Sequence, residues 1–212
     1  MGDVVRSEEG DVIRDSLEPD RPPGRLVVAM TGATGTIYGI RLLEVLRDTA
    51  LETHVVMSLW AERTMVAETD RKPDRVAALA IRAWDEHDLT SPIASGSFAT
   101  RGMIVAPCSM RSLAAIATGT SDNLIHRAAE VTLKEGRKLL LLVRESPLSV
   151  IHLENMLRAA RAGALIVPPV PAFYARPRSL EEMVDHTVGR ILDQFGIEHG
   201  LVRRWGEKRT PG

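Results

Sequence analysis

Short runs of continuous apolar residues alternate along the chain with longer segments in which apolar residues recur every three or four positions. The continuous runs are LVVAMT (26–31), THVVMS (53–58), GMIVAPCS (102–109), KLLLLVRES (138–146) and ALIVPPV (164–170). Runs this short and this apolar are typical of strands that are covered on both faces. The pattern therefore predicts five buried strands.

The segments between these runs have helical spacing. In the first, apolar residues stand at positions 37, 40, 43 and 46, on one face of a helix. Further helices are predicted within 61–70, 76–89, 112–119, 123–136, 149–163 and 179–196. Asp122 or Asn123 would cap the helix that ends at Gly136, and Ser179 with Glu182 would form a capping box. This alternation predicts an α/β fold, a single Rossmann-like or flavodoxin-like domain whose parallel sheet has helices on both faces.

The two ends of the chain differ from this pattern. Residues 1–24 are charged and end in Arg-Pro-Pro-Gly, so we expect a disordered N-terminal extension without the apolar run of a signal peptide. The folded domain is expected over residues 25–205, followed by a short tail at 206–212.

Composition and charge narrow the classes of function. The formal net charge of −1 gives no reason to expect binding to nucleic acid or to a membrane surface. No stretch reaches the roughly 18 apolar residues of a membrane-spanning helix. The single cysteine, Cys108, excludes an intrachain disulfide and a cysteine-rich metal site. A cytoplasmic protein is the expectation, because thiols stay reduced there.

Polar residues follow the predicted strands, where ligands bind in a doubly wound sheet. They are Thr34, Ser58, Ser109, Arg144 with Glu145, and Tyr174. The first turn, TGATG (31–35), opens a helix whose backbone N–H groups attract anions, and its glycines allow a ligand to come close. Two interpretations stay open for this turn, a phosphate or cofactor site and a simple helix cap by Thr34.

The segment APCSMRS (106–112) repeats this arrangement. Hydroxyl groups of Ser109 and Ser112 open a second helix and suit a second anchor for a phosphorylated cofactor. Cys108 beside them fits a small buried residue better than a nucleophile.

The most apolar strand ends in two charged residues, Arg144 and Glu145. Charges at the end of such a strand are costly unless they are paired or used. One interpretation is a structural ion pair. The other is a functional pair in which Arg144 binds a cofactor or phosphate and Glu145 donates or accepts a proton.

Four further residues have both a structural and a functional interpretation. Arg127 and Lys134 share a helical face, where solvated charges are the simpler explanation. Tyr174 lies between prolines and either packs or reaches a ligand. Arg190 stands in the apolar stretch TVGRIL, which favours a salt bridge or a phosphate contact.

The histidines have no metal-binding or catalytic-triad spacing, so we expect no catalytic metal.

Several long stretches together resemble the UbiX-type flavin prenyltransferases, in particular members that accompany phenolic or hydroxyarylic acid decarboxylases. They include AMTGATGTIYGIRLLE, APCSMRSLAAIATGTSDNLIHRAAEVTLKE, LLVRESPLSVIHLENMLRAARAGALIVPPVPAFYARP and VDHTVGRILDQFGI, and the resemblance runs from about residue 26 to Trp205. It implies transfer of a dimethylallyl group from dimethylallyl monophosphate to N5 and C6 of reduced FMN, without a metal. It also implies a homo-oligomer, often a dodecamer, and a UbiD-type decarboxylase that receives the prenylated FMN.

The resemblance further implies roles for individual residues. Those implied to bind FMN are Gly32, Ala33, Thr34, Ser58, Ser109, Met110, Arg111, Ser112 and Arg144. Those implied to bind dimethylallyl phosphate are Tyr174, Arg190, Lys134 and Arg127. The implied catalytic residues are Glu145, which would manage protons at the departing phosphate, Lys134, Glu68 as a second functional carboxylate, and Thr34, whose hydroxyl would lie near flavin N5.

The sequence departs from the family pattern at two positions. Thr34 stands where the family usually has serine, and Leu89 where some members carry an aromatic residue near the prenyl site. Two other functions are alternatives. A flavin-dependent cysteine decarboxylase of the same fold would show a PASANT loop and a PxMNxxM clamp, which this sequence lacks. A non-catalytic FMN-binding subunit would not need the phosphate-binding set that is retained.

Overall fold

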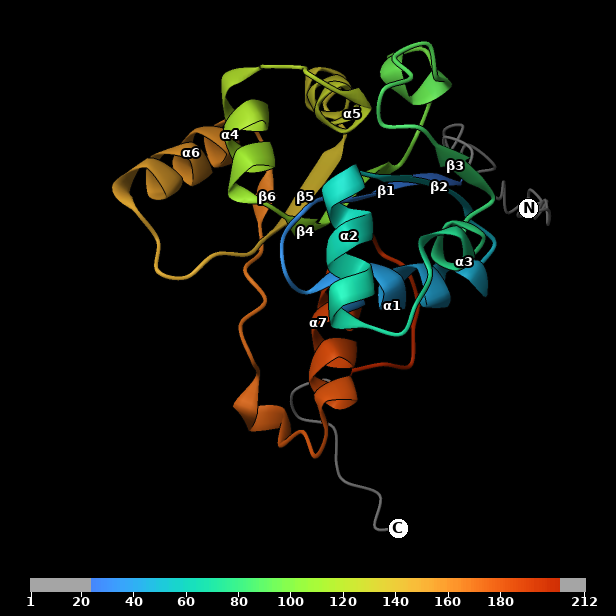
Figure 1. Ribbon diagram of the computed structural model, residues 1–212, viewed down its shortest axis with the longest axis vertical. Coiled ribbons are helices and arrows are strands. Elements are labelled where there is room, and N and C mark those ends of the chain that lie inside the picture. Colours follow the sequence, from blue (N-terminus) through green and yellow to red (C-terminus); the bar gives the residue numbers. More distant parts are fainter. Residues whose placement is uncertain (1–23, 203–212) are drawn as a thin grey trace, which may run out of the picture.

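The computed structural model describes residues 24–202 (Figure 1). Its strands are β1 (Arg25–Met30), β2 (Glu52–Met57), β3 (Arg82–Trp84), β4 (Gly102–Cys108), β5 (Lys138–Val143) and β6 (Leu165–Ile166). Its helices are α1 (Thr36–Arg47), α2 (Leu59–Glu68), α3 (Pro73–Ala77), α4 (Met110–Thr118), α5 (Leu124–Lys134), α6 (Val150–Arg161) and α7 (Leu180–Gln194), with short 3₁₀ turns η1 (Pro92–Ala94) and η2 (Phe173–Ala175). The predicted extension, apart from Gly24, and the predicted tail lie outside the described residues.

The strands form one parallel sheet in the order β3-β2-β1-β4-β5-β6. The chain runs outward from β1 to β3, returns to place β4 beside β1, and then runs outward to β6. The reversal lies between β1 and β4, and this is where a doubly wound sheet opens a crevice for a ligand. The predicted α/β fold with a parallel sheet is confirmed.

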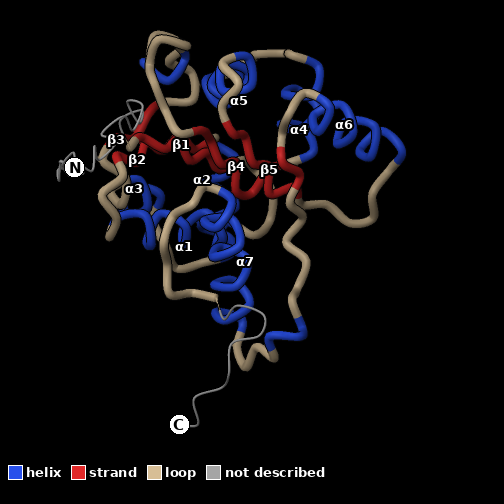
Figure 2. The backbone as a smooth tube through the Cα atoms, turned by 180° about the vertical axis from the view of Figure 1, so that it is seen from behind, coloured by secondary structure: helices blue, strands red, loops and turns tan. Residues whose placement is uncertain are grey.

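Helices cover both faces of the sheet (Figures 1 and 2). On one face, α1, α2, α3 and α7 bury side chains such as Leu43, Met65 and Val188 against the strands. On the other face, α4, α5 and α6 bury Leu113, Ile125 and others. Because both faces are covered, every residue of β4 is buried, as the continuous apolar run predicts.

The structure corrects the helix predicted over residues 76–89. That segment holds only the end of α3, and it continues as the edge strand β3. Contacts with β2 stabilise a strand here in place of a helix: Ala83 pairs with Val55, and Trp84 Nε1 donates a hydrogen bond to His54 Nδ1 over 3.0 Å. Local apolar spacing contains no information about these partners.

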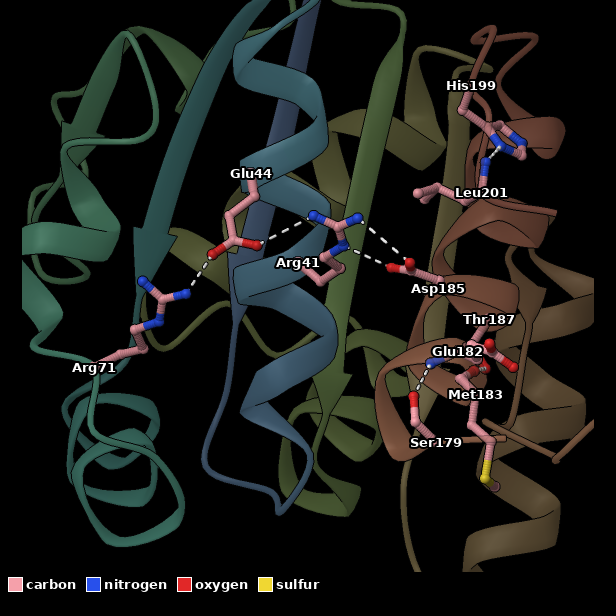
Figure 3. Close-up of polar contacts among 10 residues, drawn as sticks. All are labelled: Arg41, Glu44, Arg71, Ser179, Glu182, Met183, Asp185, Thr187, His199 and Leu201. Atoms are coloured by element: carbon pink, nitrogen blue, oxygen red, sulfur yellow. Dashed lines mark hydrogen bonds and ion pairs between the residues drawn. The ribbon is translucent and has the colours of Figure 1, made fainter. Parts of the chain in front are cut away.

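Two smaller predictions also differ in detail. Only Leu165 and Ile166 of the predicted strand 164–170 pair with β5. The Ser179 hydroxyl accepts from the backbone N–H of Glu182 (Figure 3). The Glu182 carboxylate, however, accepts from the N–H of Arg178, one residue earlier than a capping box requires. At α5 the prediction is confirmed, since the Asn123 side chain caps the helix.

Candidate functional site

Segments that follow four adjacent strands meet at the carboxyl edge of the sheet. Ser58 follows β2, the 31–35 turn follows β1, Ser109 follows β4 and Arg144 follows β5. Backbone hydrogen bonds connect them: Ser58 N donates to Met30 O over 3.0 Å, and Arg144 N donates to Cys108 O over 3.2 Å. The structure thus brings together the predicted flavin-binding positions.

Thr31 fixes the two turns at the centre of this edge relative to each other. Its hydroxyl donates to Pro107 O over 2.9 Å and accepts from Ser109 N over 2.7 Å, and the residue is 1% exposed. The turn after β1 and the turn after β4 are therefore held together at the point where the strand order reverses. From the sequence, Thr31 was expected where the first strand meets the turn and had no assigned role, although a hydroxyl at the end of an apolar strand was a usable signal.

A carboxylate of this chain, that of Glu68, occupies the N-terminus of α1, where the sequence suggested that an anion could bind. The carboxylate of Glu68, at the end of α2, accepts from the N–H of Gly35 at 3.1 and 3.0 Å and from the N–H of Thr36 at 3.0 Å. It also accepts from the Thr36 hydroxyl at 2.9 Å. The helix is capped neither by Thr34, as one interpretation had it, nor by its N-cap residue Gly35, which has a φ of 95° and no side chain.

Hydrogen bonding keeps Glu68 ionised. Partial burial raises the pKa of this carboxyl group, but hydrogen bonds from Thr34, Thr36 and the Gly35 N–H outweigh it and hold the pKa below its ordinary value. The hydroxyl of Thr34 is therefore oriented by a carboxylate that stays charged at neutral pH. Both residues belong to the implied catalytic set, although nothing in the sequence indicated a contact between them.

The 31–35 turn also lies tightly against the start of α2. A Cβ atom added to Gly32 would lie 2.4 Å from Trp60 Cβ, so only glycine fits at this position. The neighbouring Ser58 caps α2 by accepting from Ala61 N over 3.1 Å. The turn is thus held close to two helix N-termini.

A groove of about 680 Å³ opens beside this turn, between α1 and α7. Thr34 and Glu68 line it together with Leu180 and Val184 of α7. An ion-pair chain crosses it: Arg41 Nε lies 2.6 Å from Asp185 Oδ1, and Glu44 connects Arg41 to Arg71 (Figure 3). Sequence reasoning did not single out these charges, because no local pattern relates residue 41 to residue 185.

Hydroxyl groups line the N-terminus of α4. Ser109 caps the helix by accepting from Ser112 N over 3.3 Å, and the two hydroxyl oxygens are 3.2 Å apart. Met110 is half-buried and Arg111 is exposed. Cys108, in contrast, is fully buried, and burial raises the pKa of its thiol to about 12, so it has no thiolate character.

Arg144 and Glu145 are both exposed where β5 ends. Within residues 24–202 they form no ion pair with each other; Glu145 Oε1 accepts from Ser146 N over 2.9 Å. Arg144 lies near Tyr38 of α1, since its positive charge opposes the burial that raises the pKa of that phenol. The arrangement leaves a cation and a carboxylate exposed at the same edge as Thr34 and Ser109.

Two of the predicted phosphate-binding residues lie at the opposite edge of the sheet. Lys134 is the last residue of α5, just before β5 begins, and it pairs with Glu135. Arg127 lies further along α5, where its Nε donates to Ala94 O over 3.2 Å and its Nη1 to Glu130 over 3.0 Å. Within one chain, β5 separates Lys134 from Glu145 by about 20 Å.

The other two phosphate-binding candidates are on the C-terminal part of the chain. Tyr174 lies in η2, where its hydroxyl is 3.1 Å from His186 Nε2. Arg190 lies in the last turns of α7 and pairs with Asp193 over 2.8 Å. Because the Lys138 ammonium at the start of β5 donates to Gln194 O, this end of α7 is also near the amino edge. A single chain therefore does not bring Arg190 and Lys134 to Glu145.

The described residues contain no group of three His, Cys, Asp or Glu side chains that could hold a metal ion. Across residues 24–202, no helix has both the length and the apolar character needed to cross a membrane. Leu89, at the position where an aromatic residue is found in some family members, is 50% exposed in the loop after β3.

Parallel strands, the reversal of strand order between β1 and β4 and the hydroxyl-lined helix N-termini define an α/β protein of the nucleotide- and flavin-binding class. The model of the flavoprotein family matches residues 15–192. The chain is 56% identical over 195 residues to the flavin prenyltransferase PAD1, mitochondrial, of Saccharomyces cerevisiae, which covers 92% of this chain and 80% of the yeast protein.

Solved structures agree with this match. AnUbiX (PadA1), crystallised with FMN and dimethylallyl pyrophosphate, superposes with a TM-score of 0.85 at 54% identity, covering 87% of this chain and 98% of that chain. A dodecameric FMN-dependent UbiX-like decarboxylase from Escherichia coli O157:H7 superposes with a TM-score of 0.85 at 53% identity, covering 86% of this chain and all of that chain. The chain belongs to the flavoprotein family and, within it, to the UbiX-like flavin prenyltransferases.

Proposed function

We propose that this protein transfers a dimethylallyl group from dimethylallyl monophosphate to reduced FMN. The bond between the allylic carbon and the phosphate oxygen breaks, and the double bond of the dimethylallyl group is consumed as bonds form at flavin N5 and C6. One of the two protons displaced from N5 and C6 goes to the former alkene and the other to the phosphate, so that inorganic phosphate and prenylated FMN leave. Family membership supports this most strongly, together with one observation: hydroxyl groups, two helix N-termini and the charged side chains of Arg144 and Glu145 all lie at the carboxyl edge.

The carboxyl edge fits FMN as the acceptor substrate. The first-turn N–H groups of Met110 and Arg111 have no preceding carbonyl within α4, and Ser109 and Ser112 add hydroxyls beside them, so this turn suits the flavin phosphate. Gly32 lets the flavin approach the backbone of the first turn. Arg144 adds a cation at the same edge.

Two carboxylates have distinct proposed roles. Glu145 is exposed at this edge and would take up a proton released by the flavin and pass it to the departing phosphate. Glu68 acts through Thr34, because its charge fixes the hydroxyl that we place near flavin N5.

The phosphate of the allylic substrate would be bound by residues of neighbouring copies. Lys134, Arg127, Tyr174 and Arg190 carry the charges and phenol suited to an anionic leaving group, yet within one chain Lys134 and Arg190 lie away from Glu145. The Escherichia coli O157:H7 relative is dodecameric. A homo-oligomer of this chain, with sites between subunits, would bring the two groups together.

The resemblance to the UbiX-type enzymes implies that a UbiD-type decarboxylase uses the product. We propose the cytoplasm as the compartment of this protein. Reduced conditions there suit the one free thiol of the chain. The name of the yeast relative places that protein in mitochondria, so fractionation of cells that express the full chain with a C-terminal tag is the relevant test.

Mass spectrometry of the flavin distinguishes the proposed function from its alternatives. The protein is incubated anaerobically with reduced FMN and dimethylallyl monophosphate, and the released flavin is weighed. A gain of one C₅H₈ unit supports the transferase. Unchanged flavin with turnover of a peptide carrying a C-terminal cysteine would instead indicate a cysteine decarboxylase, and unchanged flavin without turnover would indicate a binding subunit.

A further inference from the structure

A buried histidine lies behind the N-terminus of α4, on the neighbouring helix α5. His126 is 4% exposed, and its Nε2 is 3.3 Å from Ser112 Oγ. Ser112, itself 6% exposed, lies 3.2 Å from the Ser109 hydroxyl, which caps α4. Three side chains from two helices therefore form one hydrogen-bonded row that ends where we place the flavin phosphate.

The surroundings of His126 determine where its proton lies. Burial lowers the pKa of the ring; the carboxylates of Asp122 and Glu86 oppose this, and the charge of Arg111 adds to it. The neutral ring has one N–H. Nδ1 is buried and has no hydrogen-bond partner among the described residues. Because a buried N–H without a partner is rarer than an unpaired acceptor, the proton belongs on Nε2, which donates to Ser112.

This assignment constrains the Ser112 hydroxyl. Its oxygen accepts from His126 and from Ser109, which uses both lone pairs. Its own O–H then points to neither partner and is available to donate at the start of α4, beside the N–H groups of Met110 and Arg111. The ring sets the direction of a donor that belongs to the candidate site.

We propose that His126 is a positioning residue that directs the Ser112 hydroxyl toward the phosphate of the bound flavin. The inference rests on the proposed function, in which the first turn of α4 holds that phosphate. Because the His126 ring is buried and its Nε2 faces Ser112, its effect would reach the flavin only through the Ser112 hydroxyl.

Selectivity between FMN and riboflavin, which lacks the phosphate, separates this role from a general structural one. Dissociation constants for both flavins are measured by fluorescence titration with the full chain. His126→Leu should raise the Kd for FMN about tenfold, the size expected when a hydrogen bond to a charged group is weakened, and leave the Kd for riboflavin unchanged. His126→Gln, whose Nε2 can still donate to Ser112, should restore FMN binding.

Two further variants complete the design. Thr132→Val is the matched control, since Thr132 is buried on the same helix and its hydroxyl donates only to Ala128 O, over 2.7 Å. It should leave both constants unchanged. In a Ser112→Ala background, His126→Leu should have no further effect, because the group that it positions is gone. His126→Asn, whose shorter amide does not reach Ser112, replaces the leucine variant if that one does not fold.

The outcomes separate this inference from the proposed function. A His126→Leu protein that keeps the full preference of the wild type for FMN, or that loses both flavins equally, would overturn the positioning role and leave prenyl transfer untouched. A wild-type protein with equal affinity for FMN and riboflavin would overturn the phosphate anchor at α4 and, with it, the role of His126.

Discussion

The carboxylate of Glu68 caps helix α1 in place of a side chain at the N-cap position, which is occupied by Gly35. Both carboxylate oxygens are within 3.1 Å of the Gly35 N–H, although the residues are 33 apart in sequence. The end of α2 is thereby joined to the turn after β1, and a charged group is held beside the hydroxyl of Thr34.

Replacing Glu68 by glutamine should lower stability at neutral pH by about 1 kcal/mol, as for other lost caps. The folded pKa of Glu68 lies below the ordinary value of 4.5. Its stabilisation is therefore complete above that value and is lost as the pH falls through the folded pKa. Urea unfolding of wild type and variant should differ at pH 7, and the difference should shrink as the pH falls below 4.5 through the folded pKa. A constant difference across this range would contradict the assignment. Asp70→Asn, an exposed change two residues away, is the control.

Thr34 should tolerate serine but not valine. Serine keeps the hydroxyl that Glu68 orients, so Thr34→Ser should retain most prenyl transfer. Thr34→Val keeps the shape and removes the hydroxyl, and its turnover should fall by about tenfold or more. Initial rates of prenylated FMN formation measure both, and equal rates for the two variants would show that the hydroxyl takes no part.

Glu145→Gln should bind FMN as the wild type does and lose most of its transfer activity. The side chain is exposed where β5 ends and, within residues 24–202, accepts only from Ser146 N, so the change costs little stability. Loss of a proton donor or acceptor typically costs about 100-fold or more in rate. Glu154→Gln, an exposed glutamate on α6, is the matched control. Unimpaired transfer by Glu145→Gln would remove this residue from the mechanism.

The ion pair between Arg41 and Asp185 should matter more than exposed pairs of the same kind. Its nitrogen and oxygen are 2.6 Å apart, and both side chains are about one-third exposed, at 34% and 28%. Asp185→Asn should lower the free energy of unfolding by about 1 kcal/mol, the upper end for pairs near the surface. Asp48→Asn, which breaks the exposed pair with Arg47, should have no measurable effect. Denaturant titration measures the free energy of unfolding of both variants. Equal losses of stability would show that the Arg41–Asp185 pair contributes no more than an exposed pair.

The sequence pattern predicted those elements whose type follows from the spacing of their own apolar residues. The continuous apolar runs became buried parallel strands because both faces of the sheet are covered, as in β4. The edge strand β3 was missed, because Trp84 is held there by His54 of another strand. The prolines at 168 and 169 explain why the predicted last strand extends over only two residues.

The candidate site was also predictable only in part, because some of its contacts join residues that are distant in sequence. Thr34 and Ser109 lie at one edge because both follow strands of a parallel sheet, so their proximity could be predicted from the sequence. The contacts of Glu68 with Gly35 and of His126 with Ser112 join residues from different helices, and no spacing encodes them. The separation of Lys134 from Glu145 became visible only when α5 was seen to end at the amino edge.

Mixing two inactive variants tests most directly whether both edges of the sheet serve one reaction. Lys134→Ala and Glu145→Gln chains are co-expressed with different tags, and oligomers that contain both are purified. Random assembly should give about one intact site in four if each site takes Glu145 from one copy and Lys134 from another. We expect prenyl transfer in the mixed oligomers far above that of either parent. Activity no higher than the parents would contradict a site shared between copies.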